Sequence, residues 1–235
     1  MKKSHLVKTY INSFFELFFP NTCEACSKRL SVGESVICTD CLYNLPRTKN
    51  HEYTENSTEE LFRGLIPIDY ATSFFYFNKG SSYRKLIHDL KYKGKKHLAV
   101  SLGEHFGAEI KDSLFAAVDL LVPVPLHPLK KLKRGFNQSE QIILGMAATM
   151  DKSYDFKNLV RTVNTETQTK KNLSERRENV NSVFHVKNPG DFEGKHLLLV
   201  DDVVTTGSTL AACAEEILKV PGAKVSVATL GIAGS

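Results

Sequence analysis

Long apolar runs are missing from the 235 residues of this chain. No stretch of 18 apolar residues occurs, so the sequence predicts no membrane-spanning helix. Apolar positions near the start are interrupted by Thr9, Asn12, Ser13 and Glu16, and no small-residue cleavage site follows, which argues against a secretory signal peptide. With 42% apolar and 24% charged residues, the chain can form one substantial domain and a small module. We expect a cytoplasmic protein.

Cysteine is also scarce, and four of the five cysteines fall into two Cys-x-x-Cys pairs: Cys23 with Cys26, and Cys38 with Cys41. Two such pairs at this separation supply four thiolates for a closed, structural, tetrahedral Zn²⁺ site. A dithiol redox site is disfavoured because neither pair opens a βαβ unit. The sequence therefore predicts a zinc-ribbon-like module within residues 1–46. Two roles stay open for it: bracing an N-terminal helix, or helping to bind nucleic acid.

That N-terminal helix is predicted over residues 5–19, where apolar side chains recur on one face, and Pro20 would end it. We expect the apolar face to pack against the core. Its aromatic residues and the nearby lysines leave an interfacial helix on a membrane surface as the alternative.

The most informative stretch is HLLLVDDVVTTGSTL, residues 196–210. Its apolar run suits a strand buried on both faces of a parallel sheet, and Asp201 and Asp202 stand at the carboxyl end of that run. These acids can accept from sugar hydroxyls or hold Mg²⁺. The turn that follows opens a helix, where backbone N–H groups and hydroxyls favour a phosphate. The predicted phosphate-binding residues are Thr205, Thr206, Gly207, Ser208 and Thr209.

Positive charge is concentrated in two segments, since residues 79–97 carry seven Lys and Arg against one acid, and residues 127–177 carry eleven against five. Either segment can attract polyphosphate, nucleic acid or an anionic membrane, or can form an ordinary solvated surface. In the second, Lys133 and Arg134 follow a predicted strand, where we expect a basic loop to contact a pyrophosphate. In the first, the candidate nucleic-acid contacts are Lys91, Tyr92, Lys93, Lys95 and Lys96, with Tyr92 available for stacking.

Strands alternate with helices along the rest of the chain, which predicts an α/β domain with a parallel sheet. We expect a domain at 81–235, preceded by a linker and strand at 47–80, in which the polar residues 47–66 form the linker or a surface loop. Residues 162–171 are polar without periodicity, which is typical of a mobile loop, and a helix is expected from Leu173 or Ser174. The predicted strands are 71–78, 119–126, 159–161, 183–186, 197–200 and 224–232, and the other predicted helices begin near residues 81, 98, 137 and 210.

The motif within residues 196–210 resembles the phosphoribosyl-pyrophosphate (PRPP) site of type I phosphoribosyltransferases: four apolar residues, two acids, two apolar residues, then T-T-G-[GS]-T. It lacks the Gly-Lys-Ser/Thr of kinase phosphate loops. Further stretches extend the resemblance over nearly the whole chain, to the ComF/ComFC family. They are the two cysteine pairs, LIHDLKYKGKKHLA (86–99), LVPVPLHPLKKLKRGFNQSEQI (121–142), Gln168 and LSERRENVNSVF (173–184).

The resemblance implies a type I phosphoribosyltransferase fold with flanking helices, PRPP bound with Mg²⁺, and a role in natural transformation. There, single-stranded DNA is handled at the cytoplasmic side of the membrane, and a competence helicase or an inner-membrane DNA channel are candidate partners. Peripheral membrane association fits that role. Catalysis is not implied, and the five cysteines do not suit a glutaminase. The alternative is a nucleobase-salvage enzyme that transfers phosphoribosyl from PRPP and releases pyrophosphate.

Overall fold

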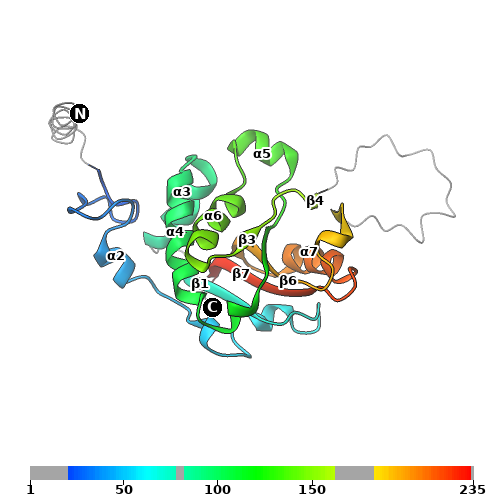
Figure 1. Ribbon diagram of the computed structural model, residues 1–235. Coiled ribbons are helices and arrows are strands. Elements are labelled where there is room, and N and C mark those ends of the chain that lie inside the picture. The colour runs from blue at the N-terminus through cyan, green and yellow to red at the C-terminus, as the bar shows by residue number, and fades with distance from the viewer. Residues whose placement is uncertain (1–20, 78–81, 162–182, 234–235) are drawn as a thin grey trace, which may run out of the picture.

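A five-stranded parallel sheet forms the centre of the protein (Figure 1). The computed structural model describes residues 21–77, 82–161 and 183–233. In spatial order the strands are β1 (Ala71–Phe77), β7 (Lys224–Ala233), β6 (His196–Val204), β2 (Leu120–Pro123) and β3 (Ser153–Tyr154). The predicted parallel α/β sheet is therefore confirmed.

Strands β6 and β7 lie at the middle of the sheet because their side chains are apolar on both faces. Eight consecutive residues of β7 are buried, and the first five of β6 are buried as well. Their register places Leu199 beside Val227 and Asp201 beside Thr229. The chain thus carries its adjacent acids along a buried strand to the carboxyl edge of the sheet.

Helices cover both faces of the sheet and bury two apolar layers. On one face lie α3 (Ser82–Tyr92), α4 (Lys96–Ile110) and α6 (Gln138–Met150) (Figure 1). On the other face lie α7 (Ser208–Leu218) and an antiparallel pair made by β4 (Leu159–Arg161) and β5 (Phe184–Val186). None of the described helices is both long and apolar enough to cross a membrane.

The polar segment 47–66 differs from the linker or surface loop expected there. It contains the short 3₁₀ turns η1 (Asn50–Glu52) and η2 (Glu59–Phe62), and Phe62 is 1% exposed. Asn56 Nδ2 donates to Ala71 O at 3.0 Å, at the start of β1. Hydrogen bonds from polar side chains, which a hydropathy pattern does not reveal, hold the segment against the sheet. Strand β1 pairs with β7 in the central sheet. The domain boundary expected between residues 80 and 81 therefore follows a strand that belongs to the same sheet as the later strands.

The basic loop expected after β2 is instead a short helix, α5 (Pro128–Arg134). Pro128 occupies its first turn, the His127 side chain accepts from Leu129 N at its start, and Gly135 ends it at φ 79°. These are favourable residues for helix ends. Leu129 and Leu132 are exposed, so no buried stripe marks the helix in the sequence.

The remaining short elements are α2 (Thr39–Tyr43), η3 (Leu114–Ala117) and η6 (Pro189–Asp191). Three predictions fall outside the described residues: the helix at 5–19, the mobile loop at 162–171 and the helix from residue 173 or 174.

Candidate functional site

The carboxyl ends of β6 and β2 lie beside a cleft of about 170 Å³. Parallel strands end at the same edge of a sheet, which is where α/β proteins hold ligands. The acids at the end of β6 therefore lie near the residues that follow β2 and begin α6. The cleft is lined by Lys91, Val124, Pro125, Leu126, Arg134, Asn137, Gln138, Ser139, Arg161, Asp201, Asp202 and Thr209.

Two adjacent carboxyls form the floor of this cleft. Asp201 Oδ1 accepts from Ser139 Oγ at 3.0 Å and from the Asp202 backbone N–H at 2.8 Å. Burial, followed by the neighbouring Asp202 charge, raises the pKa of Asp201 to about 7. Burial also raises the pKa of Asp202, which Lys91 Nζ opposes from 3.4 Å. One ammonium thus faces the carboxyls of half-buried Asp201 and buried Asp202, and a divalent cation or sugar hydroxyls would satisfy their free oxygens.

The turn after β6 is shaped for an anion. Gly207 has φ 74°, in the left-handed region that glycine adopts without strain, and it is buried while the residues on either side are exposed. Helix α7 starts at once, with Ala211 N donating to Gly207 O at 2.8 Å. The first N–H groups of a helix have no intrahelical acceptors and can donate to a phosphate. Exposed hydroxyls surround them, and Thr206 Oγ1 lies 2.9 Å from Ser208 Oγ.

A basic wall closes the other side of the cleft. Arg134 Nη1 donates to Gln138 Oε1 at 3.0 Å, and its Cζ lies 5.8 Å from the centre of the Tyr92 ring. Arg161 enters from β4, with Cζ 5.4 Å from the centre of the Phe184 ring. The structure thus brings predicted residue Arg134 to the acidic pair. Only the backbone of Lys133 is described, in α5.

Sequence reasoning missed Ser139 and Arg161. Ser139 stands within the RGFNQS string, but its hydrogen bond to Asp201 joins residues 62 positions apart. Arg161 lies in the second basic segment, where nothing local distinguishes it from the other cations. Both contacts come from tertiary structure.

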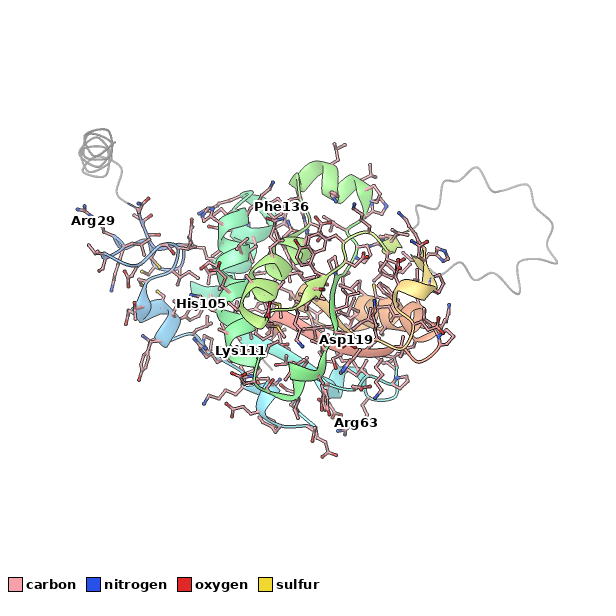
Figure 2. All side chains as sticks on the ribbon, viewed as in Figure 1. Arg29, Arg63, His105, Lys111, Asp119 and Phe136 are labelled. Atoms are coloured by element: carbon pink, nitrogen blue, oxygen red, sulfur yellow. The ribbon has the colours of Figure 1, made fainter. Side chains whose placement is uncertain are left out.

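The five predicted nucleic-acid contacts have different surroundings in the structure. Lys91 points into the cleft, whereas Lys93 Nζ lies 2.9 Å and Lys95 Nζ 3.4 Å from the carboxylate of Asp89. Tyr92 is 62% exposed beside Arg134. Lys96 Nζ lies 5.6 Å from the centre of the Phe136 ring, and Figure 2 shows Phe136 at the base of α5. Lys91 is therefore a cleft residue in this structure.

The four paired cysteines gather in a candidate metal centre, and their Sγ atoms all lie within 4.8 Å of one another. Zn–S bonds of about 2.3 Å in a tetrahedron need S···S distances of about 3.8 Å, and Cys26 Sγ lies 3.8 Å from Cys38 Sγ. Burial opposes ionisation of Cys23, but backbone N–H groups, first that of Cys26, lower its pKa to about 7. The residues fit a closed site for a metal such as zinc.

This module contacts the main body through α3 and the start of α4. Lys85 Nζ donates to Glu24 O at 2.6 Å, and the Glu24 carboxylate pairs with Lys95 and with His97 Nε2, the latter at 3.2 Å. Tyr83 Oη also donates to Cys41 O at 3.2 Å. The module, which carries Arg29 at the far side from the sheet (Figure 2), therefore braces the helix that carries Lys91.

Comparisons with known proteins agree with this geometry. Residues 132–232 match the family described as "Phosphoribosyl transferase domain". The chain is 29% identical over 212 residues to "DNA utilization protein YhgH" of Escherichia coli (strain K12), with 87% of each chain covered. It is 27% identical over 209 residues to "Competence protein ComFC" of Bacillus subtilis (strain 168), covering 88% of this chain and 76% of that protein.

Among solved structures, glutamine PRPP amidotransferase from B. subtilis is 16% identical with a TM-score of 0.44, and the match covers 61% of this chain and 30% of that one. The domain match, the two long relatives, the parallel sheet and the four-cysteine cluster together support a phosphoribosyltransferase-like protein of the ComF/ComFC family.

Proposed function

We propose that the cleft at the carboxyl edge of the sheet binds PRPP with Mg²⁺, and that the protein is a competence factor that handles single-stranded DNA. One observation carries the first part: an acidic pair and a basic wall line one cleft, and the anion-binding turn lines an adjoining cleft that shares Asp201 and Thr209 with it. Each of these parts matches one chemical group of PRPP.

The turn at 205–209 receives the 5-phosphate, because its N–H groups and hydroxyls are exposed donors. Asp201 and Asp202 accept from the ribose hydroxyls. Lys91 and Arg134 contact the pyrophosphate, Arg134 through two parallel N–H groups, and we expect Lys133 to reach the same end. Mg²⁺ would offset pyrophosphate charge, and the free carboxylate oxygens of the acidic pair suit it. If the protein is an enzyme, it is a Mg²⁺-dependent phosphoribosyltransferase.

A calorimetric titration with PRPP and Mg²⁺ tests this assignment. Binding to the wild type, strongly reduced in the double variant Asp201→Ala/Asp202→Ala, supports it. Equal affinity in both proteins would contradict the placement of the ligand.

The role in DNA uptake is supported by the names of relatives, a DNA utilization protein and a competence protein, and by the exposed ring of Tyr92 in a basic segment. In this role the protein acts at the cytoplasmic face of the membrane, in the cytoplasm or peripherally attached, beside a competence helicase or an inner-membrane DNA channel. Fluorescence anisotropy with a labelled single-stranded oligonucleotide is the test. Affinity should fall steeply with salt, and no binding at low salt would reject this part.

The second candidate is nucleobase salvage, favoured by the domain match and by the same cleft. Release of pyrophosphate from PRPP, measured against a panel of free bases, separates the two. Turnover with one base establishes salvage. If no base in the panel leads to pyrophosphate release although PRPP binds, salvage is rejected and the competence function is retained.

For the cysteine cluster we propose one structural Zn²⁺ per chain, held by Cys23, Cys26, Cys38 and Cys41. Elemental analysis of the purified protein should give one zinc per chain. Cys38→Ser should abolish it, whereas Cys213→Ser, which changes a buried thiol of α7, should not. Full zinc content in Cys38→Ser would contradict the assignment.

A further inference from the structure

The anion-binding turn rests on one aromatic ring from a distant part of the chain. We propose that Phe62 is a positioning residue that holds the turn at 205–209 in the conformation that receives a phosphate monoester. This inference rests on the proposed function, because it names the part of the protein on which that function's phosphate contact depends.

The contact is made at the only buried residue of the turn. Thr205, Thr206, Ser208 and Thr209 are exposed, so their side chains give the turn little packing from above. Below it, a methyl group added to Gly207 would lie 3.1 Å from Cε1 of Phe62 and 3.3 Å from Leu61 O. The Phe62 ring is 1% exposed and belongs to the apolar layer that contains Val204 and Leu210, which flank the turn.

The position of Phe62 is fixed by hydrogen bonds to the sheet. Asn56 Oδ1 accepts from Thr58 N at 3.0 Å and from Glu59 N at 3.1 Å, which starts the 3₁₀ turn that ends at Phe62. Thr58 Oγ1 donates to Ser73 Oγ at 3.0 Å, and Ser73 Oγ lies 2.8 Å from Thr229 Oγ1. Buried hydroxyls thus connect the 3₁₀ turn to β1 and β7. The ring is a rigid support because its backbone is held by strands of the central sheet.

This arrangement has a consequence for ligand binding. N–H groups donate well to a phosphate only when they converge on it, and Gly207 sets their direction from the left-handed region. Without the ring, the turn can sink toward the space it leaves and the N–H groups diverge. We place the pyrophosphate at Lys91 and Arg134, in a cleft whose lining does not include Phe62. Loss of the ring should therefore weaken binding of the 5-phosphate selectively.

The test compares Phe62→Leu with a matched control, Phe192→Leu. Both phenylalanines are fully buried in the same apolar layer, but Phe192 precedes β6 and so lies at the opposite end of that strand from the turn. Calorimetry measures the affinity of each full-length protein for ribose 5-phosphate and, separately, for pyrophosphate with Mg²⁺. Phe62→Met, which keeps an apolar side chain of similar length, serves as the conservative variant.

We expect Phe62→Leu to bind ribose 5-phosphate about tenfold more weakly and pyrophosphate within twofold of the wild type, a loss of about one charged hydrogen bond. Phe192→Leu should keep both affinities, and Phe62→Met should recover most of the loss. An unchanged ribose 5-phosphate affinity in Phe62→Leu, or an equal loss in Phe192→Leu, would overturn the inference.

Hydrogen–deuterium exchange over residues 205–211 tests, without a ligand, whether Phe62 supports the turn. Exchange should be faster in Phe62→Leu than in Phe192→Leu, notably at Ala211 N, which donates to Gly207 O. Equal exchange would overturn the support by Phe62. If the wild type binds neither compound, the proposed PRPP site fails, and the exchange data still report whether Phe62 holds the turn.

Discussion

Two buried acidic regions of this molecule have opposite electrostatics. The Asp89 side chain on α3 is 1% exposed, with Lys93 Nζ at 2.9 Å, Lys85 Nζ at 3.3 Å and Lys95 Nζ at 3.4 Å. Burial alone would raise its pKa, but hydrogen bonds and charge from these cations, first from Lys93, lower it to about 2. At the carboxyl edge of the sheet, Asp201 and Asp202 share Lys91, and both of their pKa values are raised.

The difference separates a structural carboxylate from a binding one. Three lysines of the chain compensate the charge of Asp89. Two of them, Lys85 and Lys95, also bind Glu24 of the module that carries the cysteines.

The pair at 201–202 has less compensating charge, since both pKa values stay raised although Lys91 and Arg134 lower that of Asp202. A buried carboxyl with too little compensating charge is costly unless a ligand or cation supplies the rest. We therefore assign the ligand to the second region and a bracing role to the first.

The largest expected effect comes from removing both carboxyl groups of the binding region. Asp201→Ala/Asp202→Ala should weaken PRPP binding at least about 100-fold, because each charged hydrogen bond contributes about 1.5–3 kcal/mol. The melting temperature should stay level or rise, since a buried like-charge pair is removed. Calorimetry and thermal melting measure both. A double variant that unfolds would mean that these acids are structural, as Asp89 is.

Removing the charge of the bracing region should have the converse effect. Asp89→Asn leaves three lysines without their buried partner and should lower the free energy of unfolding by about 2 to 3 kcal/mol, a value reduced for the partial exposure of those lysines. PRPP affinity should change far less. Urea denaturation measures the stability, with Asp112→Asn as an exposed control expected within about 0.5 kcal/mol of the wild type. Equal stabilities of the two variants would contradict the bracing role.

The two regions should also differ in how they depend on pH. Folded Asp201 keeps its proton up to about pH 7, whereas the unfolded chain loses it near the usual value of 3.8. Its contribution to stability is therefore present below about pH 4 and is lost as the pH rises through 7. We expect a decrease of about 3 kcal/mol between pH 5 and pH 7.5, since the interval from pH 5 to the folded pKa spans about two units and each corresponds to about 1.4 kcal/mol.

Asp201→Asn should flatten this slope in urea denaturation at the two pH values. Asp89, whose pKa is lowered, contributes above about pH 4 and loses its effect only as the pH falls toward 2. The raised pKa would be contradicted if the stabilities of the wild type and of Asp201→Asn changed equally between pH 5 and pH 7.5.

The smallest effect concerns two lysines at the end of one helix. Lys91→Gln should weaken PRPP binding about 5- to 10-fold, the value of one charged contact in a partly exposed site. Lys93→Gln should leave the affinity within about twofold, because Lys93 pairs with Asp89. Equal losses in both would indicate a general effect of positive charge in place of a contact at the cleft.

Local patterns sufficed for half of the site and for every strand except the two-residue β3 (Ser153–Tyr154), which was not predicted. Leu197 to Val200 form an unbroken apolar run, which suits a doubly buried strand, and the acids and then the TTGST turn follow within nine residues. The two cysteine pairs were equally clear, because metal ligand spacing is a local property.

Contacts between distant residues could not be read in the same way. The pairing of Lys91 with Asp202 joins α3 to β6, and a run of cations gives no sign of which one enters the cleft. Phe62 stands in a polar segment whose hydrogen bonds, such as those of Asn56, resemble loop chemistry until the sheet is present. Helix α5 was missed because its leucines face solvent, so that its ends alone define it.

A crystal structure with PRPP and Mg²⁺ bound tests the central claim most directly. We predict that the 5-phosphate lies within hydrogen-bond distance of the N–H groups at 206–209, the ribose hydroxyls on Asp201 and Asp202, and the pyrophosphate beside Lys91 and Arg134. Density for PRPP at another surface, with the Asp201–Asp202 pair unchanged and Lys91 still on Asp202, would contradict it.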